Sequence, residues 1–258
     1  MTGTASTVPP ARPSVLIPVA PGTNRDRELA DAFELAGAAA VAAPLHDLRN
    51  GDVKLADHQI LALPGGFSYG DALGAGRLLG LDLVGWFGDQ LREAQARQMP
   101  IIGICNGFQA LVRAGLLPGS DVRAALVANA SGRFECRWVT LAPSPVRSVW
   151  LDGLDGTLRC PVAHGEGRLV VDDPGAVGGT VALRYVDEHG LGVAGRYPEN
   201  PNGSVLDAAG LVDGTGLVLG LMPHPEDHVT SRQDPLRGRS TGGRCLALFR
   251  AGVAAVGG

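Results

Sequence analysis

The chain has 258 residues, enough for one large α/β domain and few for two. With a formal net charge of −4 and no run of Lys or Arg, it has no sequence signature of a nucleic-acid-binding face. No apolar run approaches the roughly 18 residues of a membrane span. The four cysteines lack C-x-x-C spacing, which favours a reducing cytoplasm over a zinc site or a disulfide framework.

The first half of the chain has the pattern of βαβ units. Residues 1–13 are predicted to be a disordered polar tail, and residues 14–258 a single domain that begins with the continuous apolar run SVLIPV. A continuous run, rather than an alternating one, indicates a strand buried on both faces of a parallel sheet. The elements expected in this half are strands at residues 14–19, 40–45, 59–63 and 101–104, a helix at 26–37, and a long, partly amphipathic helical region at 75–98.

The second half has a different sequence pattern, with short strand-like runs separated by Gly, Pro, Asp and Asn. These runs fall at residues 133–141, 157–163, 168–171, 180–186, 192–197 and 217–222, and a closing helix is expected at 243–253. Such spacing indicates antiparallel strands that extend the sheet or form a subsidiary layer. The predicted fold is therefore α/β, a doubly wound and mainly parallel sheet extended by antiparallel strands.

The sequence Gly103-Ile104-Cys105-Asn106-Gly107 has the form G-x-C-x-G, at the junction of an expected buried strand and an expected helix. This is the pattern of a nucleophile elbow, in which flanking glycines allow a sharp turn that presents one side chain above the strand ends. At a helix N-terminus, unpaired N–H groups favour a thiolate and can hold an oxyanion. The alternative is an ordinary buried cysteine, because free cysteines are among the most buried residue types.

A cysteine nucleophile needs a base, and the base needs an orienting group. The apolar run at residues 217–222 leads directly into PHPE, which places His224 at a strand end and Glu226 two residues later. The glycine-rich stretch PGGFSYGD, residues 64–71, follows the third expected strand, where a backbone N–H can complete an oxyanion hole. His164, in the corner motif PVAHGEG, is a further candidate for the lining of a pocket.

The motifs PGGFSYGD, GICNGFQ, SGRFECRWVTL, AHGEG, NPNGS and LMPHPE together resemble those of class I, triad-type glutamine amidotransferases. Within that class they are most similar to the glutaminase subunits and domains of phosphoribosylformylglycinamidine synthase, over residues 15–249. The resemblance implies a flavodoxin-like fold and a role in de novo purine biosynthesis. In that role the chain hydrolyses glutamine to glutamate and ammonia through a cysteine thioester, and passes the ammonia to an ATP-dependent synthetase.

The same resemblance implies roles for individual residues. Cys105 is the nucleophile, His224 the acid and base, and Glu226 the residue that orients His224. The implied glutamine site consists of Gly66, Phe67, Asn106, Gln109, Arg133 and Phe134. The backbone N–H groups of two of these, Gly66 and Asn106, form the implied oxyanion hole.

The implied partners are glutamine, a large synthetase subunit and a small third subunit, with no nucleic acid and no membrane. No metal or organic cofactor is implied for this chain, because ATP and Mg²⁺ are used by the synthetase. The chain departs from the family pattern in its polar tail, at residues 24–25 and in the Arg- and Gly-rich segment 227–242, which bear on the partner interface.

Two other functions stay open at this point. Other cysteine hydrolases of flavodoxin-like fold also carry an elbow cysteine, but they place their acid elsewhere and lack H-P-E after a late strand. A non-catalytic docking subunit would keep the fold without turnover, and the intact set of Cys105, His224 and Glu226 argues against it.

Overall fold

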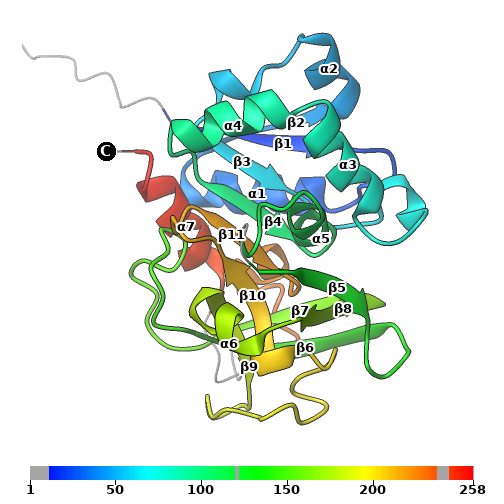
Figure 1. Cartoon of the computed structure of the whole chain (residues 1–258). Helices are drawn as coiled ribbons and strands as arrows, with labels where there is room; N and C mark the ends of the chain where they lie inside the picture. Colours follow the sequence, from blue (N-terminus) through cyan, green and yellow to red (C-terminus); the bar gives the residue numbers. More distant parts are fainter. Residues whose placement is uncertain (1–11, 120–121, 237–243, 258) are drawn as a thin grey trace, which may run out of the picture.

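A mixed sheet of nine strands runs through the protein, with a separate two-stranded sheet beside it (Figure 1). The computed structural model describes residues 12–119, 122–236 and 244–257. The strands are β1 (Ser14–Val19), β2 (Ala39–Pro44), β3 (Ile60–Leu63), β4 (Ile101–Ile104), β5 (Ala124–Ala128), β6 (Glu135–Pro143), β7 (Leu158–His164), β8 (Glu166–Val171), β9 (Val181–Val186), β10 (Ala208–Val212) and β11 (Val218–Leu221). The helices are α1 (Asp26–Ala36), α2 (Leu45–Asn50), α3 (Arg77–Gly85), α4 (Gly88–Ala96), α5 (Asn106–Arg113), α6 (Pro174–Val177) and α7 (Leu246–Ala254).

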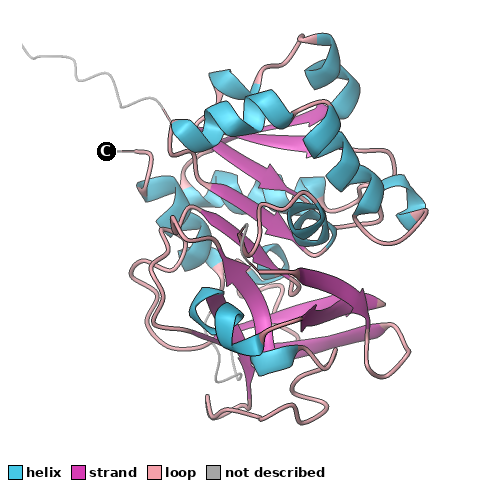
Figure 2. Cartoon of the chain, viewed as in Figure 1, coloured by secondary structure: helices cyan, strands magenta, loops and turns pink. Residues whose placement is uncertain are grey.

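The first half of the large sheet is parallel, in the order β2-β1-β3-β4-β11. Every residue of β3, β4 and β11 is buried, as expected for strands that helices cover on both faces. Helices α1 and α7 pack together through Phe33 and Phe249, whose ring centroids are 5.2 Å apart. Helices α3 and α5 pack against each other on the opposite face, so the parallel half is doubly wound (Figure 2).

The second half of the large sheet is antiparallel and continues from β11 in the order β10-β9-β6-β7. Strands β5 and β8 pair separately as the small second sheet. The C-terminal end of β7 returns to the parallel half, because the Pro161 carbonyl accepts a 2.8 Å hydrogen bond from the His224 N–H. The antiparallel half thus forms one wall beside the carboxyl ends of the parallel strands.

The predicted fold class is confirmed, and several expected elements are corrected. The helical region expected at residues 75–98 is two helices, α3 and α4, because the helix is interrupted at Trp86 and Phe87. The strand expected at residues 192–197 is an irregular loop, since Ala194 and Gly195 adopt φ of 51° and 80°, which an extended backbone does not tolerate. The sequence reasoning also missed β5, β10 and α2.

The division into a tail at residues 1–13 and one domain at residues 14–258 stays a prediction, because residues 1–11 lie outside the described ranges. The segment 227–242 is likewise described only up to residue 236. Among the helices of the described ranges, none combines the length and apolar character needed to cross a membrane.

Candidate active site

The junction of β4 and α5 is a sharp turn made by Cys105 itself, which adopts φ 50° and ψ −105°. A non-glycine residue at positive φ is strained by about 1–3 kcal/mol, and such strain is concentrated at functional sites. The flanking glycines, expected to make the turn, serve close packing instead. A Cβ on Gly103 would lie 2.7 Å from the backbone of Gly107, and a Cβ on Gly107 would overlap the Leu63 carbonyl of β3.

Strand β11 lies beside β4 in parallel, with Leu221 opposite Ile104. The N–H of Cys105 donates to the Leu221 carbonyl at 2.8 Å, so the elbow is fixed to the end of β11. The chain leaves β11 toward His224, which precedes the short 3₁₀ turn η5 (Pro225–His228). Two neighbouring parallel strands therefore deliver the thiol and the imidazole to the same edge of the sheet.

Glu226 holds the imidazole of His224 in one orientation. The ring Nδ1 of His224 is 2.7 Å from Glu226 Oε1, and pairing of Nδ1–H with the carboxylate leaves Nε2 for the cysteine. Gly65, two residues after β3, lies against both His224 and Cys105. A Cβ at this position would lie 2.8 Å from His224 Cε1 and 3.5 Å from Cys105 Cβ. A glycine at this position gives the thiol and the imidazole room to meet.

The electrostatics of this group favour a proton on His224. Burial by itself lowers the pKa of His224, but the Glu226 carboxylate and the contact with Cys105 together raise that pKa well above its ordinary value. His224 Nε2 nevertheless makes no hydrogen bond of ordinary geometry, and neither does Glu226 Oε2. The imidazole of His224 can therefore take the proton of the thiol, and its Nε2 is the atom that is free to do so.

The group is almost closed to solvent. The exposed fractions are 5% for Cys105, 2% for His224 and 1% for Glu226. A low local dielectric strengthens every charge interaction inside such a site.

Two motifs of the sequence converge on the elbow through Asn106, which is 1% exposed. Its side-chain Oδ1 accepts from the Ser68 hydroxyl, and its Nδ2 donates to Asp71 Oδ1 at 2.9 Å. Burial, and then the nearby carboxylate of Glu166, raise the pKa of Asp71, which the hydrogen bond from Asn106 partly offsets. Sequence reasoning gave no role to Ser68 or Asp71, although both belong to the stretch PGGFSYGD.

Gln109, the expected contact of the glutamine substrate, lies one turn into α5 and is 3% exposed. Its Nε2 donates to the Glu166 carbonyl at 2.5 Å, and its Oε1 accepts from Asn106 Nδ2 at 3.4 Å. Both ends of its amide are therefore paired within the protein. Glu166 comes from the motif PVAHGEG, so this motif lines the same site as α5.

The other expected pocket residues surround this centre at differing depth. Gly66 has φ 119° and pairs with Thr23 in an isolated antiparallel bridge, while Phe67 is 44% exposed. Arg133 is exposed, as is Phe134 at 53%, and the Phe134 ring lies beside Gly165 of the corner motif. The roles of these four residues stay predictions.

One group of three potential metal-binding side chains occurs among the described residues, with ligand atoms of His224, Glu226 and Asp227 within 4.8 Å of one another. His224 and Glu226 already pair with each other, and Asp227 lies 3.4 Å from the Arg25 guanidinium. These internal pairs account for the charges of the group without a metal ion.

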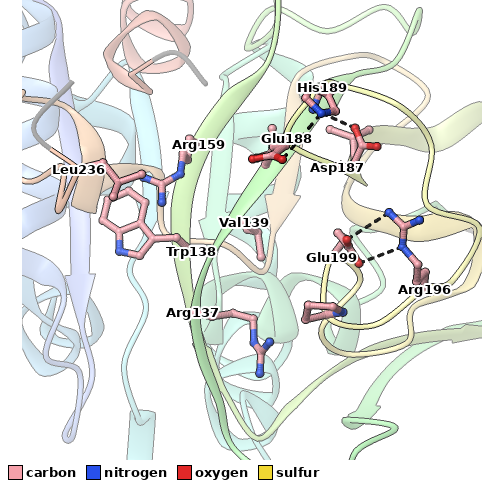
Figure 3. Close-up of a pocket in the computed structure, with 13 residues that line it drawn as sticks. Arg137, Trp138, Val139, Arg159, Asp187, Glu188, His189, Arg196, Glu199 and Leu236 are labelled. Atoms are coloured by element: carbon pink, nitrogen blue, oxygen red, sulfur yellow. Dashed lines mark hydrogen bonds and ion pairs between the residues drawn. The ribbon is translucent and has the colours of Figure 1, made fainter. Parts of the chain in front are cut away.

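A polar cavity of about 520 Å³ lies against β6, away from the elbow (Figure 3). Its three arginines are each paired with a carboxylate: Arg137 with Glu135 at 2.7 Å, Arg159 with Asp234 at 3.2 Å, and Arg196 with Glu199 at 3.1 Å. The lining offers neither a cysteine nor a serine as nucleophile. The elbow is therefore the better candidate for covalent chemistry.

Comparison with known proteins gives a consistent set of matches. The profile of the CobB/CobQ-like glutamine amidotransferase domain matches residues 12–255. Phosphoribosylformylglycinamidine synthase subunit PurQ of Treponema denticola is 42% identical over 94% of this chain and 98% of that protein. The PurQ subunit of Dehalococcoides mccartyi is 43% identical over 83% of this chain and 85% of that protein.

Solved structures agree in fold. A chain of the structure of PurLQS from Thermotoga maritima has a TM-score of 0.75 at 34% identity, covering 95% of this chain and 99% of that chain. A glutamine amidotransferase from Thermotoga maritima has a TM-score of 0.58 at 16% identity, covering 95% and 98%, which is a likeness of fold alone.

Proposed function

This chain belongs to the family of CobB/CobQ-like glutamine amidotransferase domains, and from that premise we propose that it is the glutaminase subunit of a phosphoribosylformylglycinamidine synthase. It hydrolyses glutamine to glutamate and ammonia, and an ATP-dependent synthetase subunit consumes the ammonia in de novo purine biosynthesis. The observation that carries the proposal is the strained Cys105 elbow facing His224, whose ring is held by Glu226 at 2.7 Å.

The chemistry follows from this arrangement. Cys105 Sγ attacks the carboxamide carbon of glutamine while its proton passes to His224 Nε2. The N–H of Asn106, at the start of α5, and that of Gly66 stabilise the negative charge that develops on the carboxamide oxygen. His224 then delivers its proton to the nitrogen, the C–N bond breaks, and ammonia leaves a glutamyl thioester on Cys105.

Hydrolysis of the thioester reverses these roles. His224 takes a proton from water as the water oxygen attacks the thioester carbon, and the thiol regains a proton when glutamate is released. Glu226 fixes the ring and stabilises the positive charge of His224 in both halves of the reaction. We assign no metal or organic cofactor to this chain, and ATP and Mg²⁺ belong to the synthetase.

The partners in this proposal are a large synthetase subunit and a small third subunit. Support comes from the PurLQS structure that this chain matches at 34% identity. The near-complete burial of Cys105, at 5% exposure, supports activation on assembly, because a change that opens the site when the synthetase binds would give glutamine better access to the thiol. We therefore expect little glutamine hydrolysis by the isolated chain and a clear increase when the synthetase binds.

The test is reconstitution with the synthetase subunits, followed by amidine formation from either glutamine or added ammonium. We expect Cys105→Ala to reduce glutamine-dependent synthesis at least about 1,000-fold, as removal of a covalent nucleophile does. Ammonium-dependent synthesis should be unchanged, because the mutant subunit still assembles. Glutamine hydrolysis by the variant at the wild-type rate would exclude the mechanism, and a wild-type complex without glutamine-dependent synthesis would exclude the function.

A further inference from the structure

His164, expected from its motif to line a pocket, ends strand β7 next to the reaction centre, although the mechanism above gives it no role. The carbonyl of the preceding residue, Ala163, lies 3.9 Å from Cys105 Sγ. The imidazole of His164 is 4% exposed and packs against Gly167, where a Cβ would lie 2.6 Å from ring atoms Cε1 and Nδ1. The ring is therefore fixed in place, within the wall that faces the thiol.

Asn129 determines which nitrogen of His164 carries the proton. The side-chain Nδ2 of Asn129 donates to two carbonyls, those of Arg133 at 2.9 Å and of His164 at 2.8 Å. Its Oδ1 is thereby the end that faces His164 Nδ1, at 3.1 Å, and an oxygen there can only accept. Nδ1 of His164 is thus the protonated nitrogen, and in the neutral ring Nε2 carries a lone pair.

That lone pair has no partner. His164 Nε2 is one of five buried side-chain nitrogen or oxygen atoms without a hydrogen bond among the described residues. Three of the five belong to His164, His224 and Glu226, and His164 lies near enough to His224 for the charge of His224 to act on it. A buried acceptor left unpaired is unfavourable by about 1–3 kcal/mol, and in native structures a catalytic role is one of the reasons for which such an atom is retained.

Its surroundings keep His164 neutral at physiological pH. Burial first, and then the charge of nearby His224, lower the pKa of His164 to about 4, against smaller opposing effects that include the Glu135 carboxylate. A neutral His164 has no proton on Nε2, so it cannot replace His224 as the acid. It can accept a hydrogen bond from an N–H group, and most strongly from a cationic one.

We propose that His164 Nε2 accepts a hydrogen bond from the carboxamide nitrogen of glutamine, and that this bond strengthens when His224 protonates that nitrogen and makes it a cationic donor. The inference rests on the proposed glutaminase function. When His224 protonates the nitrogen, the C–N bond breaks and its electron pair remains on the departing nitrogen. One N–H of the leaving group is then held by His164, which transfers no proton itself.

The choice of the carboxamide nitrogen follows from position. The Ala163 carbonyl places this end of β7 at the sulfur atom that attacks the carboxamide carbon. The α-ammonium group is the other N–H donor of glutamine, and it lies at the opposite end of the substrate. A bond that grows during departure acts on the transition state and so affects kcat more than KM.

The test compares two substrates in the reconstituted complex: glutamine and the γ-methyl ester of glutamate, whose leaving group has no N–H. We expect His164→Phe to lower kcat for glutamine about 10- to 100-fold, the loss that accompanies one hydrogen bond to a charged donor. KM for glutamine and the rate of ester hydrolysis should stay within about threefold of wild type. His164→Gln, which restores an acceptor, should recover most of kcat. The matched control is His58→Gln, at a buried histidine beside the start of β1, and it should change the rate with neither substrate.

An equal loss with amide and ester would overturn the assignment, because both substrates carry the same α-ammonium group. A complex that hydrolyses the ester but not glutamine even as wild type would overturn the glutaminase function itself. If His164→Phe does not fold, ¹⁵N NMR of histidine-labelled Cys105→Ala protein decides. The Nε2 resonance of His164 should move upfield with glutamine and not with the ester, and an unchanged resonance would exclude the bond.

Discussion

Two cysteines of this protein precede helices and contact histidines at the two ends of the same short segment, His224 just before the 3₁₀ turn η5 and His228 at its end. Cys105 is the N-cap of α5 beside His224, and Cys245 is the N-cap of α7 beside His228. A hydrogen bond with Cys160 and contacts with His228 lower the pKa of Cys245 to about 7, although burial opposes this. By the criteria of a helix N-terminus, a histidine and a lowered pKa, the second cluster looks ready to react.

The two clusters differ in the backbone conformation of the cysteine, in the hydrogen-bond partner of the histidine and in the exposure of the thiol. Cys105 has the strained φ of 50°, whereas Cys245 has an ordinary φ of −86°. His224 is oriented by a carboxylate, but His228 Nδ1 pairs with the Arg159 carbonyl. The thiol of Cys245 is 0% exposed and donates to the same carbonyl at 3.5 Å.

A cysteine with a lowered pKa is therefore not yet a catalytic one. The Cys245 cluster satisfies its atoms internally, whereas the Cys105 cluster leaves His224 Nε2 and Glu226 Oε2 without partners. Unsatisfied atoms destabilise the free protein and become useful when a substrate arrives. We therefore expect three features to distinguish the Cys105 cluster in experiments: the carboxylate of Glu226, the access of a glutamine analogue to the thiol, and the buried histidine His164.

The largest effect should come from the carboxylate. Glu226→Gln removes the charge that raises the pKa of His224, so we expect glutamine hydrolysis to fall about 100- to 10,000-fold, as when the orienting acid of a triad is neutralised. The measurement is kcat for glutamate formation in the reconstituted complex. Ammonium-dependent synthesis reports on assembly and should not change.

Cys245→Ala is the matched control from the second cluster. It removes a thiol that also precedes a helix and contacts a histidine, yet glutamine hydrolysis should stay within about threefold of wild type. A loss as large as that of Glu226→Gln would contradict the distinction between the clusters.

Chemical labelling sharpens the comparison of access. A diazo-ketone analogue of glutamine should alkylate Cys105 in the complex at least about 100-fold faster than Cys245, whose reaction requires a local opening of the fold. Intact mass and peptide mapping identify the labelled residue, and excess glutamine should protect Cys105. Exposed Cys136 is the internal reference, since iodoacetamide should modify it at the same rate with or without glutamine. Equal labelling of Cys105 and Cys245 by the analogue would show that thiol acidity, rather than the substrate site, governs reactivity.

The Cys105 side of this contrast was predicted from the sequence, because its strand, turn and helix are contiguous in the chain; the Cys245 cluster was not. The continuous apolar run at residues 14–19 gave β1 with its observed bounds, and the strand before Cys105 was likewise correct. In a parallel sheet the carboxyl ends of neighbouring strands share one edge, so a cysteine after one strand and His224 after another are expected to meet there. Their catalytic roles stay predictions that the substitutions above test.

What the sequence did not reveal depends on contacts between distant segments. It marked His164 as a candidate for the lining of a pocket, but not that the Pro161 carbonyl of β7 pairs with the His224 N–H or that Asn129 fixes the tautomer of His164 from a separate segment. The role of Ser68 in holding Asn106 needs a contact across 38 positions of the chain. The false strand at residues 192–197 has the opposite cause, since its apolar pattern is overridden by positive φ at Ala194 and Gly195.

The smallest effect concerns the pH dependence of the free energy of unfolding. It distinguishes the two clusters because only the Cys105 cluster contains a buried histidine with a lowered pKa, His164. The pKa of His164 is about 4 in the folded protein and near 6.5 when unfolded, so the unfolded chain binds the proton first as the pH falls. Stability is fully present above pH 6.5 and decreases toward pH 4, by about 2 kcal/mol between pH 7 and pH 5. Urea unfolding of wild type and His164→Gln at these two pH values measures the difference.

The control is again taken from the second cluster, and its sign is opposite. Burial lowers the pKa of His228, but its contacts with Cys245 and the Arg159 carbonyl raise the pKa above the ordinary value. A raised pKa gives stability that is present below pH 6.5 and lost as the pH rises, so His228 adds no slope between pH 6.5 and pH 5. His228→Gln should therefore keep the acid-side loss that His164→Gln removes. If both variants remove it, or neither does, His164 is not the neutral buried group on which its proposed bond to the leaving ammonia depends.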